Sequence, residues 1–146
     1  VDLSYAQSEI AEGHFWVAFT EMRLGNLKEA TEQYQQAQAI YQKLPLPWGQ
    51  TLNARRRQLE ILSHLGDIAA RQGRFTAAER YFRESMEGRE DLANRIGLTA
   101  RTRVVLRADL ALGRMFLGDY YLFYRLNAEA ARREYQQCLE LNQELL

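Results

Sequence analysis

Apolar residues recur along this chain at steps of three and four, and the strict alternation typical of β-strands is absent. Most segments are rich in Ala, Leu, Glu, Gln and Arg, which favour helices. The clearest break is residues 45–49, which hold both prolines. The pattern predicts an all-α fold of about six helices. They span residues 3–24, 27–44, 50–72, 75–95 and 98–117, and a last one that ends near residue 145.

A stripe of alternating large and small residues follows each of two glycines, Gly25 and Gly73, at identical steps. The stripes are Leu27, Ala30, Tyr34 and Ala37, and Phe75, Ala78, Phe82 and Ser85. The small residues let a neighbouring helix approach closely while the large ones fill the space beside it. A helix, a glycine turn and a second helix form a hairpin, and Gly118 marks a third turn. We therefore expect three tandem antiparallel hairpins in one domain, with units at 1–44, 50–95 and 98–146 and a linker at 45–49.

The second unit resembles a tetratricopeptide repeat. Its Leu62-x2-Leu65-Gly66-x2-Ala69 segment, followed by the second stripe, is similar to the W-x2-L-G-x2-Y…A-x3-F pattern of that family. The turn glycines lie 48 and 45 residues apart rather than about 34, which is similar to longer repeats in multidomain regulators. The resemblance implies a stacked α-solenoid in which the first helix of each hairpin lines a concave groove.

This register assigns candidate partner-binding residues to the groove. They are Phe15, Trp16, Phe19 and Arg23 in the first unit, Glu60, His64, Asp67 and Arg71 in the second, and Arg107 in the third. The third unit is ambiguous, because Leu112-Gly113 and Gly118 imply registers two residues apart. The resemblance implies a non-catalytic scaffold that binds a peptide or a partner helix. The alternatives are a regulatory sensor module of a multidomain protein and a homo-oligomerisation module that uses the first-helix aromatics.

The segment HFWVAF, residues 14–19, places large apolar side chains on adjacent faces of the first helix. Three interpretations remain open: cover by an upstream helix, packing within the first hairpin, or a hot spot for peptide binding. Arg103 and Arg107 lie one turn apart near Arg101. They form either a solvated, salt-bridged face or a basic site for an acidic peptide, phosphate or nucleic acid.

Catalytic chemistry has little support in the sequence. There are only two histidines, and motifs for zinc, phosphate loops or paired cysteines are missing. Cys138 falls where the stripe requires a small residue, and no base accompanies it as a nucleophile would need. We expect no catalytic residue, cofactor or metal, and we interpret His64 and Asp67 as polar groove contacts.

Composition narrows the class of partner. Lys and Arg number 19, as do Asp and Glu, so the net charge is zero and nothing favours nucleic acid or membrane as the main partner. The single cysteine gives no sign of a disulfide-stapled secreted fold, so a cytoplasmic location is the default expectation. The first residue is not Met, and we therefore expect a fragment of a longer protein.

The segment YYLFY, residues 120–124, follows Gly118. Thirteen residues separate Gly118 from the next stripe alanine, against five in the other units, so the segment reads as an eight-residue insertion. The apolar spacing predicts one long last helix that begins near Tyr120 with Asp119 as its N-cap; the alternative is a separate short helix broken near residue 127. Tyr121 and Tyr124 would then be core residues. Tyr120 and Phe123 would be exposed and available to a partner or an adjacent domain.

Overall fold

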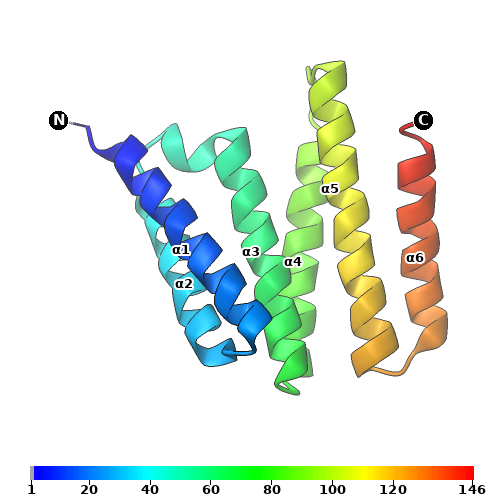
Figure 1. Ribbon diagram of the computed structural model, residues 1–146. Coiled ribbons are helices and arrows are strands. Elements are labelled where there is room, and N and C mark those ends of the chain that lie inside the picture. The colour runs from blue at the N-terminus through cyan, green and yellow to red at the C-terminus, as the bar shows by residue number, and fades with distance from the viewer. Residues whose placement is uncertain (1) are drawn as a thin grey trace.

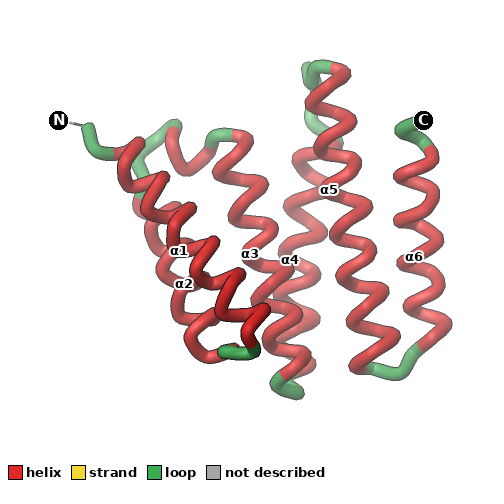
Figure 2. The backbone as a smooth tube through the Cα atoms, in the orientation of Figure 1, coloured by secondary structure: helices red, strands yellow, loops and turns green. Residues whose placement is uncertain are grey.

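Six α-helices account for most of residues 2–146, the part of the chain that the computed structural model describes. They are α1 (Ser4–Leu24), α2 (Leu27–Lys43), α3 (Leu52–Arg71), α4 (Phe75–Ala93), α5 (Ala100–Asp119) and α6 (Ala128–Gln143). A short 3-10 turn, η1 (Trp48–Gln50), precedes α3, and a π turn, η2 (Tyr120–Tyr124), continues α5. The helices pack as consecutive antiparallel pairs from the N- to the C-terminal end of the array (Figure 1). The described residues contain no strand (Figure 2), and the predicted all-α solenoid is confirmed.

Local sequence sets the ends of the helices. Gly25 and Gly73 adopt left-handed φ values of 86° and 74° and close the α1–α2 and α3–α4 turns. The N-terminus of α3 is capped by the Thr51 hydroxyl, which accepts from the Ala54 amide at 3.2 Å. An equivalent cap at α6 comes from Asn127, whose side chain accepts from the Ala130 amide at 3.0 Å.

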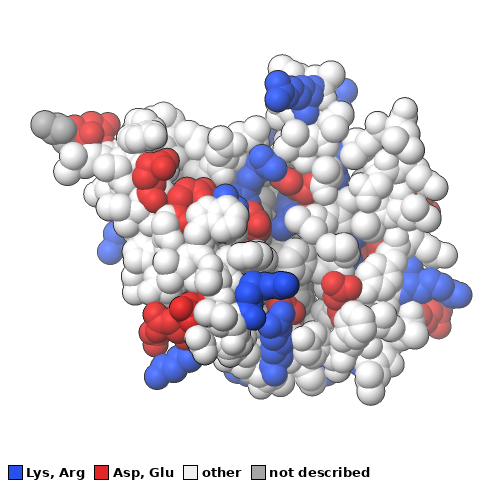
Figure 3. Space-filling view, viewed as in Figure 1, with Lys and Arg blue, Asp and Glu red and all other residues white. Residues whose placement is uncertain are grey.

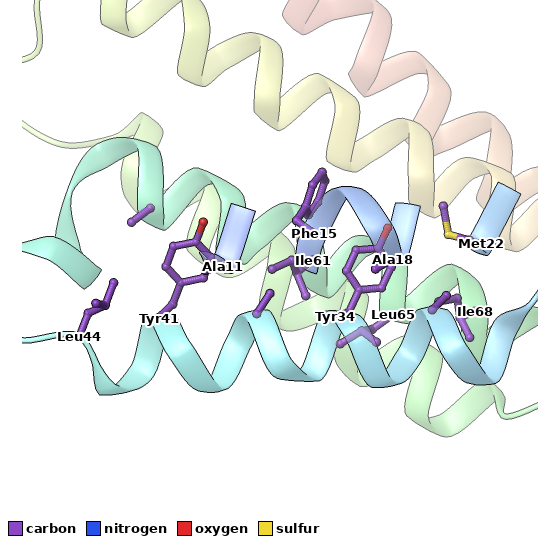
Figure 4. Packing of buried hydrophobic residues seen from close by; sticks show 13 residues of the cluster. Ala11, Phe15, Ala18, Met22, Tyr34, Tyr41, Leu44, Ile61, Leu65 and Ile68 are labelled. Carbon is purple, nitrogen blue, oxygen red and sulfur yellow. The ribbon is translucent and has the colours of Figure 1, made fainter. Parts of the chain in front are cut away.

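The largest core cluster joins the first hairpin to α3. It contains Ala11, Phe15, Ala18, Met22, Ala30, Tyr34, Ala37, Tyr41, Leu44, Ala54, Ile61, Leu65 and Ile68. Figure 4 shows side chains from α1, α2 and α3 meeting in this layer. The stripe that follows Gly25 is thus buried apart from Leu27, which is half-buried, and α3 covers it from the next unit.

A small residue in the first helix faces an aromatic ring of the second helix in each of the last two hairpins. A Cβ at Gly66 would lie 2.8 Å from the Phe82 ring, and one at Gly118 would lie 2.5 Å from the Tyr135 ring. Gly118 is therefore the counterpart of Gly66 inside α5, and its prediction as a turn residue is wrong. Both registers considered for the third unit are wrong for the same reason.

The predicted eight-residue insertion reduces to a single residue. Sixteen positions separate Gly66 from Phe82, and seventeen separate Gly118 from Tyr135. The π turn absorbs the extra residue through the bond from the Arg125 amide to the Tyr120 carbonyl, at 3.2 Å. The prediction that Asp119 caps the last helix is consequently wrong, and α6 begins at Ala128.

Continuation of α5 also reverses the predicted exposure of Tyr120. Its side chain is 1% exposed, and its hydroxyl donates to Glu79 at 2.8 Å. Burial and this contact raise the pKa of Tyr120. Phe123 is 66% exposed, as expected. Tyr121 and Tyr124, predicted as core residues, are half-buried at the edge of the cluster around Tyr120.

Leu126 occupies the turn position that glycine fills in the other two hairpins. Its φ of 52° is the only positive φ of a non-glycine residue among those described, and its side chain is 84% exposed. A left-handed conformation costs an L-residue about 1–2 kcal/mol. This turn is therefore a strained point of the backbone.

We predict that Leu126→Gly raises the free energy of unfolding by about 0.5–1 kcal/mol, because glycine relieves the strain but adds entropy to the unfolded chain. Urea denaturation measures the change. Leu46→Gly is the control, since Leu46 is also highly exposed but has no positive φ. A loss of stability at Leu126 equal to that of the control would contradict the assignment.

Candidate functional site

A hollow of about 420 Å³ lies between α1, α3, α4 and α5. Its lining residues are Glu12, Asn53, Arg56, Arg57, Leu59, Glu60, Arg89, Leu92, Leu106, Asp109 and Leu112. Leucines form its apolar part, and three arginines and three carboxylates form its polar part. On the face shown in Figure 3, acidic and basic side chains are interspersed between α1 and α5. The hollow thus presents charges of both signs around a small apolar centre.

Arg57 joins the first unit to the second across this face. Its Nε donates to both carboxylate oxygens of Glu12, at 2.9 and 3.1 Å, and its Nη1 donates to Glu60 at 2.7 Å. The guanidinium also lies 4.0 Å from the centroid of the Phe15 ring and 5.3 Å from that of Trp16. Ion pairing and cation–π contact therefore hold α1 against α3 at the hollow.

Arg56 makes the corresponding link from the second unit to the third. Its guanidinium binds the Asp109 carboxylate through two bonds, Nε to Oδ2 at 2.6 Å and Nη2 to Oδ1 at 3.1 Å. The hydrogen bonds that Arg56 donates to Asp109 raise the pKa of Arg56. Such a paired geometry fixes direction as well as distance. The three first helices of the hairpins are thus tied together in sequence order.

Arg107, the groove candidate of the third unit, points elsewhere. It lies about 160° around α5 from Asp109, because each residue turns the helix by about 100°. Its Nη1 donates to Glu144, after the end of α6, at 2.7 Å. The groove prediction for Arg107 is therefore wrong, and Asp109 takes that place.

Arg89 is buried beneath the hollow, with only 4% of its surface exposed. Its Nε donates to the Ser85 hydroxyl at 3.2 Å and its Nη2 to the Ser63 hydroxyl at 3.1 Å, while its Nη1 donates to the backbone carbonyl of Asp109. Burial lowers the pKa of Arg89, and the charges of Asp109 and Glu60 oppose that effect. This side chain joins α3, α4 and α5 without a carboxylate bonded to it.

Sequence reasoning missed Arg89, although a signal for it exists. The stripe that begins at Phe75 continues beyond Ser85 at steps of four and three, to Arg89 and Leu92. Both of these residues are buried. A charged residue on a buried stripe indicates a polar network within the core rather than a solvated face.

His64 lies inside a cage of aromatic rings and is 6% exposed. Its ring stacks on Tyr34 at 5.5 Å, and the rings of Phe15, Phe19 and Phe116 lie within 5.9 Å, centroid to centroid. Neither ring nitrogen has a hydrogen-bond partner in the protein. His64 is thus a core residue where the units stack, which corrects its assignment as a groove contact.

The remaining candidates divide by exposure. Phe15 is fully buried, so its assignment as a partner contact is wrong, and Phe19 is half-buried against the same core. Trp16 is 53% exposed, and Arg23 is also exposed. In the second unit Arg71 pairs with Asp67 at 2.8 Å, on the same face of α3 as Glu60 and about two to three turns further along the helix. Among these candidates, Glu60 is bonded to Arg57, and the rings of Phe15 and the rim residue Trp16 lie against its guanidinium.

Within residues 2–146, no group of three or more His, Cys, Asp and Glu side chains is placed to hold a metal ion. None of the helices described is both long and apolar enough to cross a membrane.

Glu60 supplies a test of the charge network. Burial raises its pKa, but contact with His64 and the charge of Arg57 outweigh this, and the net pKa lies below the ordinary value of 4.5. A lowered pKa in the folded state means stability that is present above pH 4.5 and is lost as the pH falls through the folded-state pKa. We predict that Glu60→Gln lowers the free energy of unfolding by about 0.5–1 kcal/mol at pH 7, and by progressively less below pH 4.5.

Urea denaturation across this pH range measures the difference. Glu87→Gln serves as the control, because Glu87 is exposed on α4 and outside the network. A difference between wild type and Glu60→Gln that stays constant with pH would show that the carboxylate charge contributes nothing.

Comparisons with known proteins indicate the family of this helical array. No curated protein and no solved structure matches the chain. A sequence profile described as Tetratricopeptide repeat matches residues 9–91, which is more than half of the chain and covers most of the first and second hairpins. Together with the three stacked hairpins, this match shows that the chain belongs to the tetratricopeptide repeat family.

Proposed function

We propose that the domain is a non-catalytic scaffold that binds a peptide or a partner helix at the hollow between α1, α3 and α5. Tetratricopeptide repeats are generally protein–protein interaction modules. The observation that carries the proposal is the hollow itself, because it combines an apolar centre with polar groups from several helices. The three groove helices all contribute to it.

The hollow is held rigid, so its side chains and helices need not become ordered when a partner binds. The Arg57–Glu12 and Arg56–Asp109 pairs hold the three helices at fixed positions, and Arg89 fixes the base from below. A receptor that is already ordered loses less conformational entropy on association. Binding energy is then available for contacts with the partner.

The lining residues indicate the chemistry of the bound segment. Leu112 is 36% exposed on the wall and adjoins the more deeply buried Leu59, Leu92 and Leu106, which suits one aliphatic side chain. Arginines and carboxylates around it suit flanking polar or charged residues of either sign. Trp16, half exposed at the rim, is the type of residue that anchors partners at interfaces.

Selection from a random library of 12-residue peptides tests the proposal. We predict that peptides recovered on the wild-type domain contain an aliphatic residue flanked by charged residues. Their affinity for Asn53→Trp should fall by about tenfold or more, because the indole fills the hollow that Asn53 lines. Isothermal titration calorimetry measures each dissociation constant.

Gln36→Trp is the matched control, since it adds the same side chain at an exposed position of α2 away from the hollow. Circular dichroism checks that both variants are folded. Equal affinities for wild type and Asn53→Trp would place binding outside the hollow and refute the proposal.

A further inference from the structure

Gly13 has no explanation within its own chain. Of the nine glycines, three adopt positive φ, and five lie where a Cβ would come within 3.0 Å of a neighbouring atom. Gly13 has an ordinary helical φ, and a Cβ there would meet nothing within 4 Å. Glycine in the middle of a helix is destabilising relative to alanine, and alanine would fit in this space. A glycine at such a position allows another backbone to approach α1 closely.

An uncharged stripe runs along α1 through Gly13, and we call it the α1 seam. It consists of Leu3, Ala6, Ile10, Gly13, Val17, Thr20 and Leu24, at alternating steps of three and four. All seven residues are exposed, and the four large ones are exposed by 60, 54, 47 and 68% in chain order. The seam lies about 160° around the helix from the buried Phe15, so nothing in the hairpin covers it. Spacing of this kind is the pattern by which one helix packs on another.

The order of large and small residues along the seam is nearly the same in both directions from Gly13. Large and small residues alternate symmetrically, with Ile10 and Val17 on either side of the glycine and Leu3 and Leu24 at the two ends. A surface that pairs with itself across a two-fold axis must have this property. An antiparallel second copy of α1 would therefore bring apolar residues level with apolar residues along the whole seam.

Charges beside the seam fit the same arrangement. Asp2 lies just before the N-terminus of α1, and Arg23 lies in its last turn, so an antiparallel pair brings the acidic end of each α1 to the basic end of the second copy. On one flank of the seam, Glu9 comes level with the second copy's Trp16, so no like charges oppose each other there. Complementary end charges favour the antiparallel register over the parallel one, which would bring the two acidic ends together.

We propose that this chain forms a two-fold symmetric dimer in which two copies of α1 cross in antiparallel orientation, with their backbones closest at Gly13. The missing side chain allows the two helices to approach, and Ile10 and Val17 of each copy fill the space beside the crossing. One helix pair buries a small area, so we expect a dissociation constant on the order of 10–100 µM. The α1 seam is separate from the hollow, so dimerisation and peptide binding are measured independently.

Sedimentation equilibrium over a range of concentrations tests the dimer. We predict a monomer–dimer equilibrium for the wild type and a dissociation constant at least tenfold weaker for Ile10→Glu and for Gly13→Leu. Leu139→Glu is the control, because Leu139 lies on α6, at the other end of the array, and is 56% exposed against 54% for Ile10. Circular dichroism verifies the fold of each variant. A wild-type chain that stays monomeric at several hundred micromolar would overturn the proposal and leave the seam to a helix of another protein.

Disulfide trapping tests the register. In a Cys138→Ala background, Gly13→Cys should give a disulfide-linked dimer under mild oxidation, because the two α-carbons must lie within about 7 Å for a bridge to form. Gln35→Cys, on the exposed side of α2, should remain monomeric under the same conditions. Equal trapping at both positions, or a dimer unaffected by Ile10→Glu, would show that association uses a different surface.

Discussion

The close approach of paired helices, where a small residue of one faces an aromatic ring of the other, is the constraint on which the array depends. A Cβ at Gly66 or Gly118 would overlap the ring opposite, so these positions fix the distance between the helices of a hairpin. Ala18 has the same offset from Tyr34 in the first hairpin and is also fully buried. Because the hairpins share this geometry, they can stack and leave a continuous face of first helices.

Polar interactions then fix how the hairpins stack. Arg57 and Arg56 tie α3 to its neighbours on one face, while Arg89 occupies the interior between α3, α4 and α5. Arg89 fixes the orientation of α3, α4 and α5 relative to one another, because its donors are satisfied only when Ser63, Ser85 and the Asp109 carbonyl are in place. The same side chains that set the stacking also surround the hollow.

The spacing of apolar residues in the sequence predicted those features of the fold that depend on a single hairpin. The stripes after Gly25 and Gly73 are buried as expected except at their first residues, Leu27 and Phe75, which are half-buried, because an amphipathic helix turns its apolar side to the core. The third unit was misread because Gly118 resembles a turn glycine in sequence but serves as a contact glycine, and the one-residue π turn shifts all later positions. The third turn holds Leu126 where the other turns hold glycine, so the sequence had no glycine there to indicate where the turn lies. The burial of Phe15 and His64 was not predicted either. Rings from neighbouring helices cover both side chains, and helix periodicity alone does not show where those rings lie.

Hydrogen–deuterium exchange of the domain, with and without a saturating peptide ligand, tests most directly whether the face formed by α1, α3 and α5 is the working surface. Amides near Asn53–Glu60 and near Leu106–Leu112 line the hollow and should exchange more slowly when the peptide is bound, while those in the middle of α2 should not change. Protection confined to α2, α4 and α6 would contradict the account and move the binding surface to the opposite side of the array.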